Sequence, residues 1–187
     1  MERTLALIKP DGVLRGMTGQ ILSRLENVGL KIVGIKILIP SEEKVSRHYP
    51  DEWFESVGKK NIEYYKSKGL PITETPLEAG MRIKQKLIRY FTSGPVIPIV
   101  LEGDFAVQIL RKLAGPTDPL SAPPGTIRGD FSLDSYNIAD GQDRAIKNLI
   151  HASGSVEEAK REIAIWFDET ELCSYQSFFE EILLKGE

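Results

Sequence analysis

A transition from strand to helix is predicted by Asn148-Leu149-Ile150-His151-Ala152-Ser153-Gly154-Ser155-Val156-Glu157-Glu158. Residues 148–150 form a short apolar run typical of a strand, and Ser155 followed by Glu158 has the pattern of a capping box that opens a helix to about residue 167. His151 is therefore expected beside a helix N-terminus, where unpaired N–H groups and the helix dipole attract anions. A neutral imidazole in that place can attack a phosphate, so the segment indicates phosphoryl transfer through a phosphohistidine.

Strands and helices are expected to alternate along the rest of the chain. The patterns predict further strands at residues 4–8, 30–39 and 96–101, and helices at 19–28, 41–49, 51–68, 75–92, 105–113 and 177–184. Pro98 indicates an edge strand or a bulge. Residues 117–147 are rich in Pro and Gly, and so long an irregular segment is usually functional or disordered. The order favours an α+β, ferredoxin-like fold with a four-stranded antiparallel sheet and helices, and the alternative is a doubly wound parallel sheet.

Composition limits the classes of partner. The 187 residues suit a single domain, 1–187, and the net charge of −3 argues against bulk binding to nucleic acid or to an anionic membrane. Phosphate binding would therefore need a local cluster of Lys and Arg. The single Cys173 suits a reducing compartment, the chain contains no apolar run of about 18 residues, and the charged N-terminus does not resemble a signal peptide. We expect a cytoplasmic protein without a membrane-spanning helix.

Two polar residues after His151 are candidates to assist it. Glu162 lies one helical turn beyond Glu158, and its carboxylate could hold one ring nitrogen of His151 and leave the other as the nucleophile. A solvated surface Glu is an equally good interpretation from spacing alone. Ser153 adds a short hydroxyl at the predicted start of the helix.

Basic and polar residues elsewhere could hold phosphate. Arg128 lies between two glycines in residues 124–130, which would let the backbone approach a ligand closely, although a solvated Arg in a surface turn is the better interpretation for this feature alone. Lys9 follows the first predicted strand, where ligands gather in α/β sheets, but an ordinary turn is the alternative. Arg111 and Thr117 flank a predicted helix end, where solvated side chains are the simpler explanation.

Known nucleotide and metal motifs are absent from the sequence. There is no Walker A pattern and no GxGxxG followed by a helix. One Cys and two His far apart in sequence do not have zinc-type spacing. His48 and Tyr49 lie at a predicted helix end, where a cap or packing pair is as good an interpretation as a ligand role.

Four separate motifs, in the same order, resemble those of the nucleoside diphosphate kinase family. They are Ile8-Lys9-Pro10-Asp11-Gly12, Ser93-Gly94-Pro95-Val96, Gly125-Thr126-Ile127-Arg128-Gly129-Asp130-Phe131 and Asn148-Leu149-Ile150-His151-Ala152-Ser153. The resemblance implies that His151 is phosphorylated through Nδ1, that Glu162 orients it and that Ser153 lies beside it. It also implies that the phosphates and the ribose are held by Lys9, Tyr49, Arg111, Thr117, Arg128 and Asn148.

The resemblance further implies a ping-pong reaction between nucleoside triphosphates and diphosphates. Mg²⁺ would bridge the phosphates of the nucleotide, mainly through water and without protein metal ligands. The family is usually a homo-oligomer, a tetramer or hexamer. The alternatives are a nucleotide-binding regulatory or interaction module of the same fold without turnover, and an interaction or nucleic-acid role added by extra segments, although the near-neutral charge weighs against DNA.

The chain departs from the family pattern in several places. Ala152 and Gly154 stand where the family usually has Gly and Asp, and insertions are expected near residues 54–90 and 132–145. The spacing places Val57 where the family has the Phe that stacks on the base. Other candidates for stacking are Trp53, Phe54, Tyr64 and Tyr65, with core packing as the alternative for each.

Overall fold

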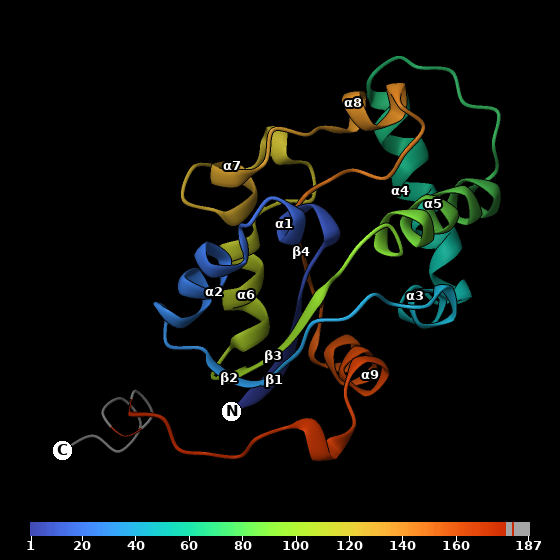
Figure 1. Cartoon of the computed structure of the whole chain (residues 1–187). Helices are drawn as coiled ribbons and strands as arrows, with labels where there is room; N and C mark the ends of the chain where they lie inside the picture. The colour runs from blue at the N-terminus through green and yellow to red at the C-terminus, as the bar shows by residue number, and fades with distance from the viewer. Residues whose placement is uncertain (179–180, 182–187) are drawn as a thin grey trace.

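The computed structural model describes residues 1–178 and 181 (Figure 1). The helix expected at residues 177–184 lies mostly outside these residues. None of the helices in the described part of the chain combines the length and the apolar character that a transmembrane span requires.

One antiparallel sheet organises the described chain. Its strands are β1 (Glu2–Ile8), β2 (Lys31–Ile35), β3 (Ile97–Gly103) and β4 (Ile150–Ala152), in the order β2-β3-β1-β4. Every neighbouring pair is antiparallel. The predicted four-stranded, ferredoxin-like α+β fold is therefore confirmed, and the doubly wound parallel sheet is excluded.

The helices cover both faces of this sheet. Their bounds are α1 (Pro10–Leu14), α2 (Thr18–Glu26), α3 (Glu42–His48), α4 (Phe54–Ser67), α5 (Pro76–Phe91), α6 (Ala106–Ala114), α7 (Ile127–Phe131), α8 (Tyr136–Gly141) and α9 (Val156–Trp166). Short 3-10 turns lie at Asp51–Trp53, Pro119–Ser121 and Glu169–Glu171. In Figure 1, α2 and α6 lie on one side of the sheet and α3, α5 and α9 on the other.

β1 lies between β3 and β4, and its residues 4–8 are buried because helices cover both faces of the sheet. Successive side chains of a strand point to opposite faces. Ala6 and Ile8 accordingly belong to the core cluster beneath α2 and α6, whereas Leu5 and Leu7 belong to the cluster beneath α3, α5 and α9. A continuous apolar run thus becomes a central strand with a core on each side.

Pro98 does not lie on an edge strand, because β3 is an interior strand. Its carbonyl accepts a hydrogen bond from Lys36 N at 3.3 Å, and the N–H and C=O of a strand residue point the same way. The N–H donor that Pro98 lacks would therefore have pointed toward β2. Because β2 ends at Ile35, no strand hydrogen bond is lost there. The predicted strand at residues 30–39 is shortened to β2 plus one isolated bridge from Leu38 to Val96. A register shift in this pairing lies between Ile32 and Gly34.

Other local expectations also needed correction. The turn expected after Lys9 is the short helix α1, which Pro10 opens, and residues 117–147 contain α7 and α8. The last strand begins at Ile150, two residues late, because Leu149 has a φ of 70° that interrupts extended backbone. The capping box at Ser155 is only half formed, since Glu158 accepts from Gly154 N instead of Ser155 N.

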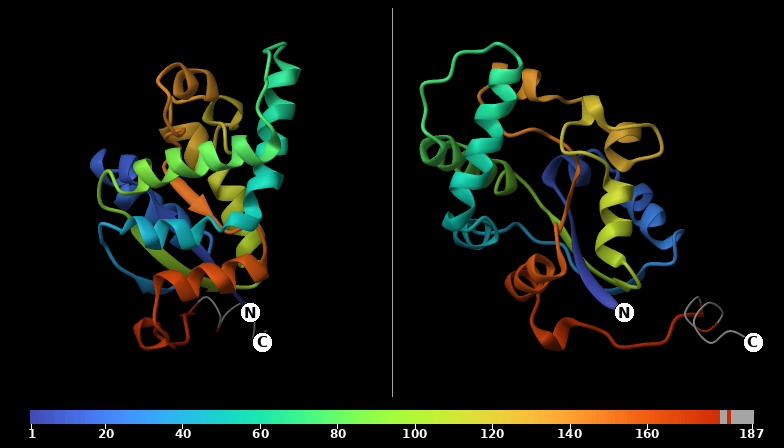
Figure 2. Two further views of the ribbon diagram at one scale, coloured as in Figure 1. Left: turned by 90° about the vertical axis from the view of Figure 1, so that its right-hand side faces the viewer. Right: turned by 180° about the vertical axis from the view of Figure 1, so that it is seen from behind.

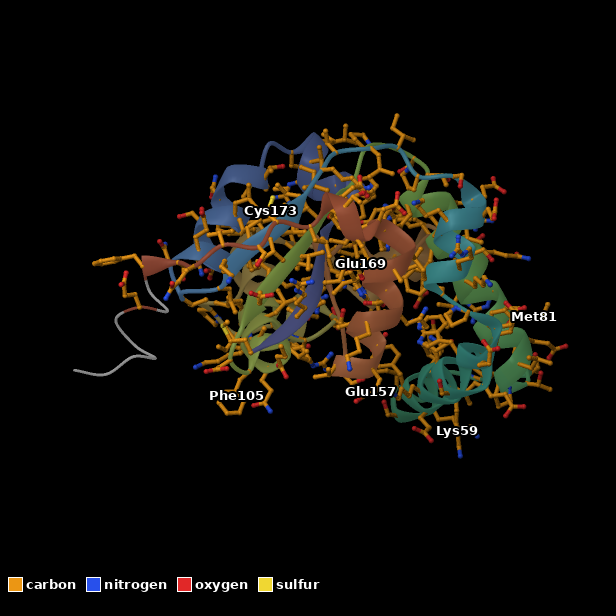
Figure 3. The ribbon with its side chains drawn as sticks, turned by 90° about the horizontal axis from the view of Figure 1, so that it is seen from below. Lys59, Met81, Phe105, Glu157, Glu169 and Cys173 are labelled. Carbon is orange, nitrogen blue, oxygen red and sulfur yellow. The ribbon has the colours of Figure 1, made fainter. Side chains whose placement is uncertain are left out.

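Helices α4 and α5 form a tightly packed pair (Figures 1 and 2). Glycines allow the close approach: a Cβ at Gly58 would overlap the carbonyl oxygen of Pro76, and one at Gly80 would overlap the backbone of Phe54. Lys59 and Met81 point outward from this pair (Figure 3). The pair therefore depends on backbone contact between its helices.

We predict that Gly58→Ala destabilises the protein by about 1–3 kcal/mol, because the added methyl group has no space between the helices. The matched control is Gly19→Ala in α2, where a Cβ meets nothing within 4 Å. That variant should be neutral or up to about 1 kcal/mol more stable. Urea unfolding of both variants measures the difference, and equal midpoints would contradict the close contact.

Candidate active site

A cavity of about 650 Å³ lies where the sheet meets α3, α4, α6 and the segment around α7 and α8. His151, on β4, lines it. The predicted phosphate and ribose residues all line the same cavity: Lys9, Tyr49, Arg111, Thr117, Arg128 and Asn148. Residues that are far apart in the sequence are thus brought together around one cavity.

Glu162 holds one nitrogen of the His151 ring from behind the cavity. Nε2 of His151 lies 3.0 Å from Oε2 of Glu162, which also accepts a hydrogen bond from Ser153 Oγ at 2.6 Å. The Glu162 side chain is 1% exposed and that of His151 is 14% exposed. Of the two interpretations of Glu162, the structure favours the buried partner of His151 over the solvated surface Glu.

Burial and nearby positive charge keep His151 neutral. Desolvation, and then the charge of Lys9, lower the pKa of His151 well below its usual range. Because a carboxylate accepts hydrogen bonds, the neutral ring keeps its proton on Nε2, toward Glu162. The lone pair of Nδ1 is then available, which is what a nitrogen nucleophile requires.

Lys9 is part of a buried polar chain at the cavity wall. Its Nζ donates to Asn148 Oδ1 at 2.6 Å, and Nδ2 of Asn148 donates to the carbonyl of Thr117 at 2.7 Å. Burial and the charge of Arg128 lower the pKa of Lys9 to about 7. Lys9 is therefore strongly desolvated, and an anion in the cavity would favour its protonated form.

Arg128 supports the same wall through the backbone. Its guanidinium donates to the carbonyls of Gly115, Ile150 and Asn148 at 2.6, 2.7 and 3.3 Å. Burial lowers its pKa to about 10, so it stays charged at neutral pH. The simple interpretation of a solvated surface Arg is wrong, because the side chain is buried.

His48 is a site residue to which the sequence assigned no definite role. Its ring packs edge-on against that of His151, with centroids 4.5 Å apart, and its Nδ1 accepts a hydrogen bond from Trp166 Nε1 at 3.2 Å. Nδ1 also lies 3.6 Å from Oε1 of Glu162. The contact with Trp166 places the proton of a neutral His48 on Nε2, which is buried and has no partner among the described residues. The position of His48 next to Tyr49 was the only signal in the sequence.

A carboxylate from α9 lies beside Gly154. Glu158 lines the cavity, and its Oε2 accepts a hydrogen bond from Gly154 N at 2.8 Å. A Cβ at Gly154 would lie 2.5 Å from that oxygen and 3.7 Å from Nη1 of Arg111. Glu158 therefore brings negative charge to the place where Gly154 lacks a side chain.

The four aromatic candidates for base stacking are separated by the structure. Trp53 and Tyr64 line the cavity, as does Val57, whereas the lining does not include Phe54 or Tyr65. Trp53 packs on Tyr49 with centroids 5.3 Å apart, at the margin of a core cluster. Tyr64 packs on Tyr136 of α8, with centroids 5.0 Å apart. The hydroxyl of Tyr65 bonds to Asp140 of α8.

The two histidines are far apart in sequence but adjacent in space. Donor atoms of His48, His151 and Glu162 lie within 4.8 Å of one another, so the described residues contain one cluster with the distances of a metal site. Two imidazoles suit zinc-like ions better than Mg²⁺, which prefers oxygen. The charges of Lys9, Arg128 and Arg161 oppose a cation beside His151.

The family model described as nucleoside diphosphate kinase matches residues 2–84 and 78–172. A nucleoside diphosphate kinase from Pyrobaculum aerophilum is 49% identical over an alignment of 179 residues, and the match covers 92% of this chain and 98% of that protein. One from Pyrococcus furiosus is 43% identical, with 94% of this chain and 88% of that protein covered.

Solved structures give the same result. An NDP kinase from Pyrobaculum aerophilum superposes with a TM-score of 0.88 at 47% identity, covering 92% of this chain and 99% of that one. A transition-state mimic of the nucleoside diphosphate kinase from Borrelia burgdorferi, with bound vanadate and ADP, superposes with a TM-score of 0.79 at 36% identity, covering 96% and 94%. With the family model matching most of its length, the chain belongs to the nucleoside diphosphate kinase family, a family of nucleotide phosphotransferases.

Proposed function

We propose that the chain transfers the γ-phosphate of a nucleoside triphosphate to a nucleoside diphosphate by a ping-pong mechanism through a phosphohistidine at His151. The observation that carries this proposal is the contact between Nε2 of His151 and Glu162, which leaves Nδ1 of a neutral ring available in a cavity lined by basic residues. We assign Glu162 and Ser153 to the orientation of the ring.

In the first half-reaction, the Nδ1 lone pair forms a bond to the γ-phosphorus, and the bond from phosphorus to the β,γ-bridging oxygen breaks. The bridging oxygen keeps the electron pair and leaves with the nucleoside diphosphate. In the second half-reaction, a terminal oxygen of the β-phosphate of another diphosphate forms a bond to the phosphorus of the phosphohistidine. The P–N bond breaks, and its electron pair returns to Nδ1 of His151. Lys9, Arg111 and Arg128 offset the negative charge on the phosphoryl group in transit.

We propose Mg²⁺ as the metal cofactor, held by the phosphates of the nucleotide and by water. The basic residues that line the cavity, Lys9, Arg111 and Arg128, suit phosphate, and the carboxylate of Glu158 is engaged by Gly154 N. Bound there, Mg²⁺ would neutralise phosphate charge and orient the phosphates. Lys9 and Arg128 would then bind the remaining phosphate oxygens.

We predict that incubation with a γ-labelled nucleoside triphosphate gives an acid-labile, base-stable label, and that His151→Ala abolishes it. Glu162→Gln should retain labelling at a rate lowered about ten- to ten-thousandfold, because an amide no longer fixes the proton on Nε2 as a carboxylate does. The rates are read by quenched-flow labelling with Mg²⁺ present. Label that survives His151→Ala contradicts the proposal, and nucleotide binding without any label would favour the module without turnover.

We predict that nucleotide binding takes up a proton at Lys9. In the protein without nucleotide, the pKa of the Lys9 amine is about 7, and a bound anion raises that pKa. Below pH 7 the amine is already charged before the nucleotide binds. Above pH 7 it must take up a proton on binding. The dissociation constant should therefore rise by up to about tenfold for each pH unit above about pH 7. Calorimetry at pH 8 in buffers of different ionisation enthalpy measures the uptake.

The matched control for this prediction is Lys9→Arg, because arginine stays protonated across this pH range. Its proton uptake should fall by about one proton, whatever its affinity for the nucleotide. Equal uptake by the two proteins would assign the proton to another group.

We propose that Tyr64, supported by Tyr136, stacks on the base. Val57 and Tyr64 of α4 line the cavity together with Trp53, the residue just before this helix. Of the two aromatic residues, Tyr64 packs on α8 and Trp53 packs on the core cluster. We predict that Tyr64→Ala raises KM about 5- to 150-fold, since stacking on an aromatic contributes about 1–3 kcal/mol. Tyr64→Phe keeps the ring and should stay near the parent value. Steady-state kinetics with a purine nucleotide tests this, and an unchanged KM for Tyr64→Ala would exclude the assignment.

We propose that residues near 54–90 and 132–145 are insertions within a single domain, 1–187. The two segments contact each other: Tyr64 packs on Tyr136, and Lys86 forms an ion pair with Asp143. Together they would form one wall of the nucleotide cavity.

We also propose a cytoplasmic homo-oligomer. Ile35, Ile37 and Ile39 are exposed on and just beyond the edge strand β2, and exposed apolar side chains at a sheet edge are typical of a surface covered by another chain.

The exposed free thiol of Cys173 suits a reducing compartment, which supports the proposed cytoplasmic location.

A further inference from the structure

The backbone is strained two residues before His151. Leu149 has a φ of 70°, and Ile150 N donates to the carbonyl of Asn148 at 2.8 Å across it. This three-residue hydrogen bond with a positive φ is the γ-turn that is rare and strained for residues other than glycine. Such a conformation persists only where its surroundings hold it.

The segment that follows β1 holds both peptide groups of Leu149. Lys9 N donates to the carbonyl of Leu149 at 2.8 Å, and Leu149 N donates to Oδ2 of Asp11 at 3.2 Å. The first bond joins two main chains, but the second depends on one side chain. Asp11 is therefore the replaceable part of the support.

A tyrosine from α5 holds Asp11 in turn. The hydroxyl of Tyr90 donates to Oδ1 of Asp11, and both side chains are buried. Burial and the charge of Asp11 raise the pKa of Tyr90 well above its usual value, so the hydroxyl remains a donor. The Asp11 carboxylate thus accepts one hydrogen bond from α5 at Oδ1 and one from the γ-turn at Oδ2.

The γ-turn joins the groups that would meet the nucleotide. Its carbonyls at Asn148 and Ile150 both accept from Arg128, and the Asn148 side chain accepts from Lys9 Nζ. His151 is the next residue along β4. A change in the turn would move His151, Asn148, Arg128 and Lys9 relative to one another.

We propose that Asp11 and Tyr90 are positioning residues that hold the γ-turn at Leu149 in the conformation that presents His151 for phosphorylation. This inference rests on the proposed role of His151. Neither Asp11 nor Tyr90 lines the cavity that His151 lines, so their effect passes through the turn and not through contact with the nucleotide. The nucleophile depends on a side chain at the start of the chain and on the last turn of α5.

The first experiment compares Asp11→Asn and Tyr90→Phe with the parent protein. We measure the single-turnover rate of acid-labile labelling at saturating nucleoside triphosphate, and the dissociation constant for the diphosphate by calorimetry. We expect labelling to slow about ten- to a hundredfold, as for a small misplacement of a reacting group, with the dissociation constant changed less than about threefold. Tyr90→Phe removes one hydroxyl only, and it carries the test if Asp11→Asn does not fold.

The second experiment tests the strain itself. Leu149→Ala and Leu149→Gly both remove the buried side chain, but only glycine adopts a positive φ without cost. We expect Leu149→Gly to be more stable and faster in labelling than Leu149→Ala, the reverse of the order at an ordinary position. Asp11→Asn should then slow labelling less when combined with Leu149→Gly than when combined with Leu149→Ala. A merely structural role for Asp11 would give equal losses.

The outcomes separate this inference from the proposed function. If the parent protein carries no label on His151, the proposed function fails. If the parent is labelled and Asp11→Asn and Tyr90→Phe are labelled at the same rate, only the positioning role is overturned. The same conclusion follows if Leu149→Ala is more stable and faster than Leu149→Gly.

Discussion

The buried carboxylate of Glu162 constrains both the packing and the chemistry of this molecule. A carboxylate that is 1% exposed must be satisfied by donors, because water cannot solvate it. Ser153 Oγ and His151 Nε2 both form hydrogen bonds to Oε2 of Glu162. These bonds fix the position of α9 relative to β4. The same contact places the proton of the histidine ring. The packing of α9 on the sheet and the chemistry of His151 thus depend on one interaction.

The remaining charges around the cavity balance burial against ligand binding. Lys9 and Arg128 are buried beside each other, and both have lowered pKa values because they lack full solvation. Backbone carbonyls and the Asn148 amide oxygen compensate them in part. A bound polyanion would supply the remaining compensation for these two charges. A chain of net charge −3 can therefore still present a basic cavity, because the positive charges are gathered locally. Helices α4 and α5 add aromatic side chains to the cavity wall without adding much unpaired charge, since Lys86 and Arg82 form ion pairs with carboxylates.

Local patterns predicted much of the fold because it follows the periodicity of the sequence. The capping box at Thr75 and the Pro at the start of α5 appear as expected, and β1 follows from its apolar run. Errors arose where the tertiary structure overrides local preference. Pro98 is tolerated in an interior strand because its missing N–H donor would face the end of β2. The last strand starts later than expected because the φ of Leu149 is positive. No local signal marks a leucine for that conformation.

The sequence by itself determined the order of the four strands and the longer helices, and the motif residues His151, Lys9, Asn148 and Arg128, because periodicity, turn residues and residue chemistry are local properties. Only the tertiary structure decided which of them meet and in what state. It buried Glu162, which makes it a partner of the ring, and it placed His48 against His151 across more than half of the chain. It also brought Glu158 to the space beside Gly154. Burial and distance between remote residues set these pKa values and contacts, and neither exists until the chain has folded.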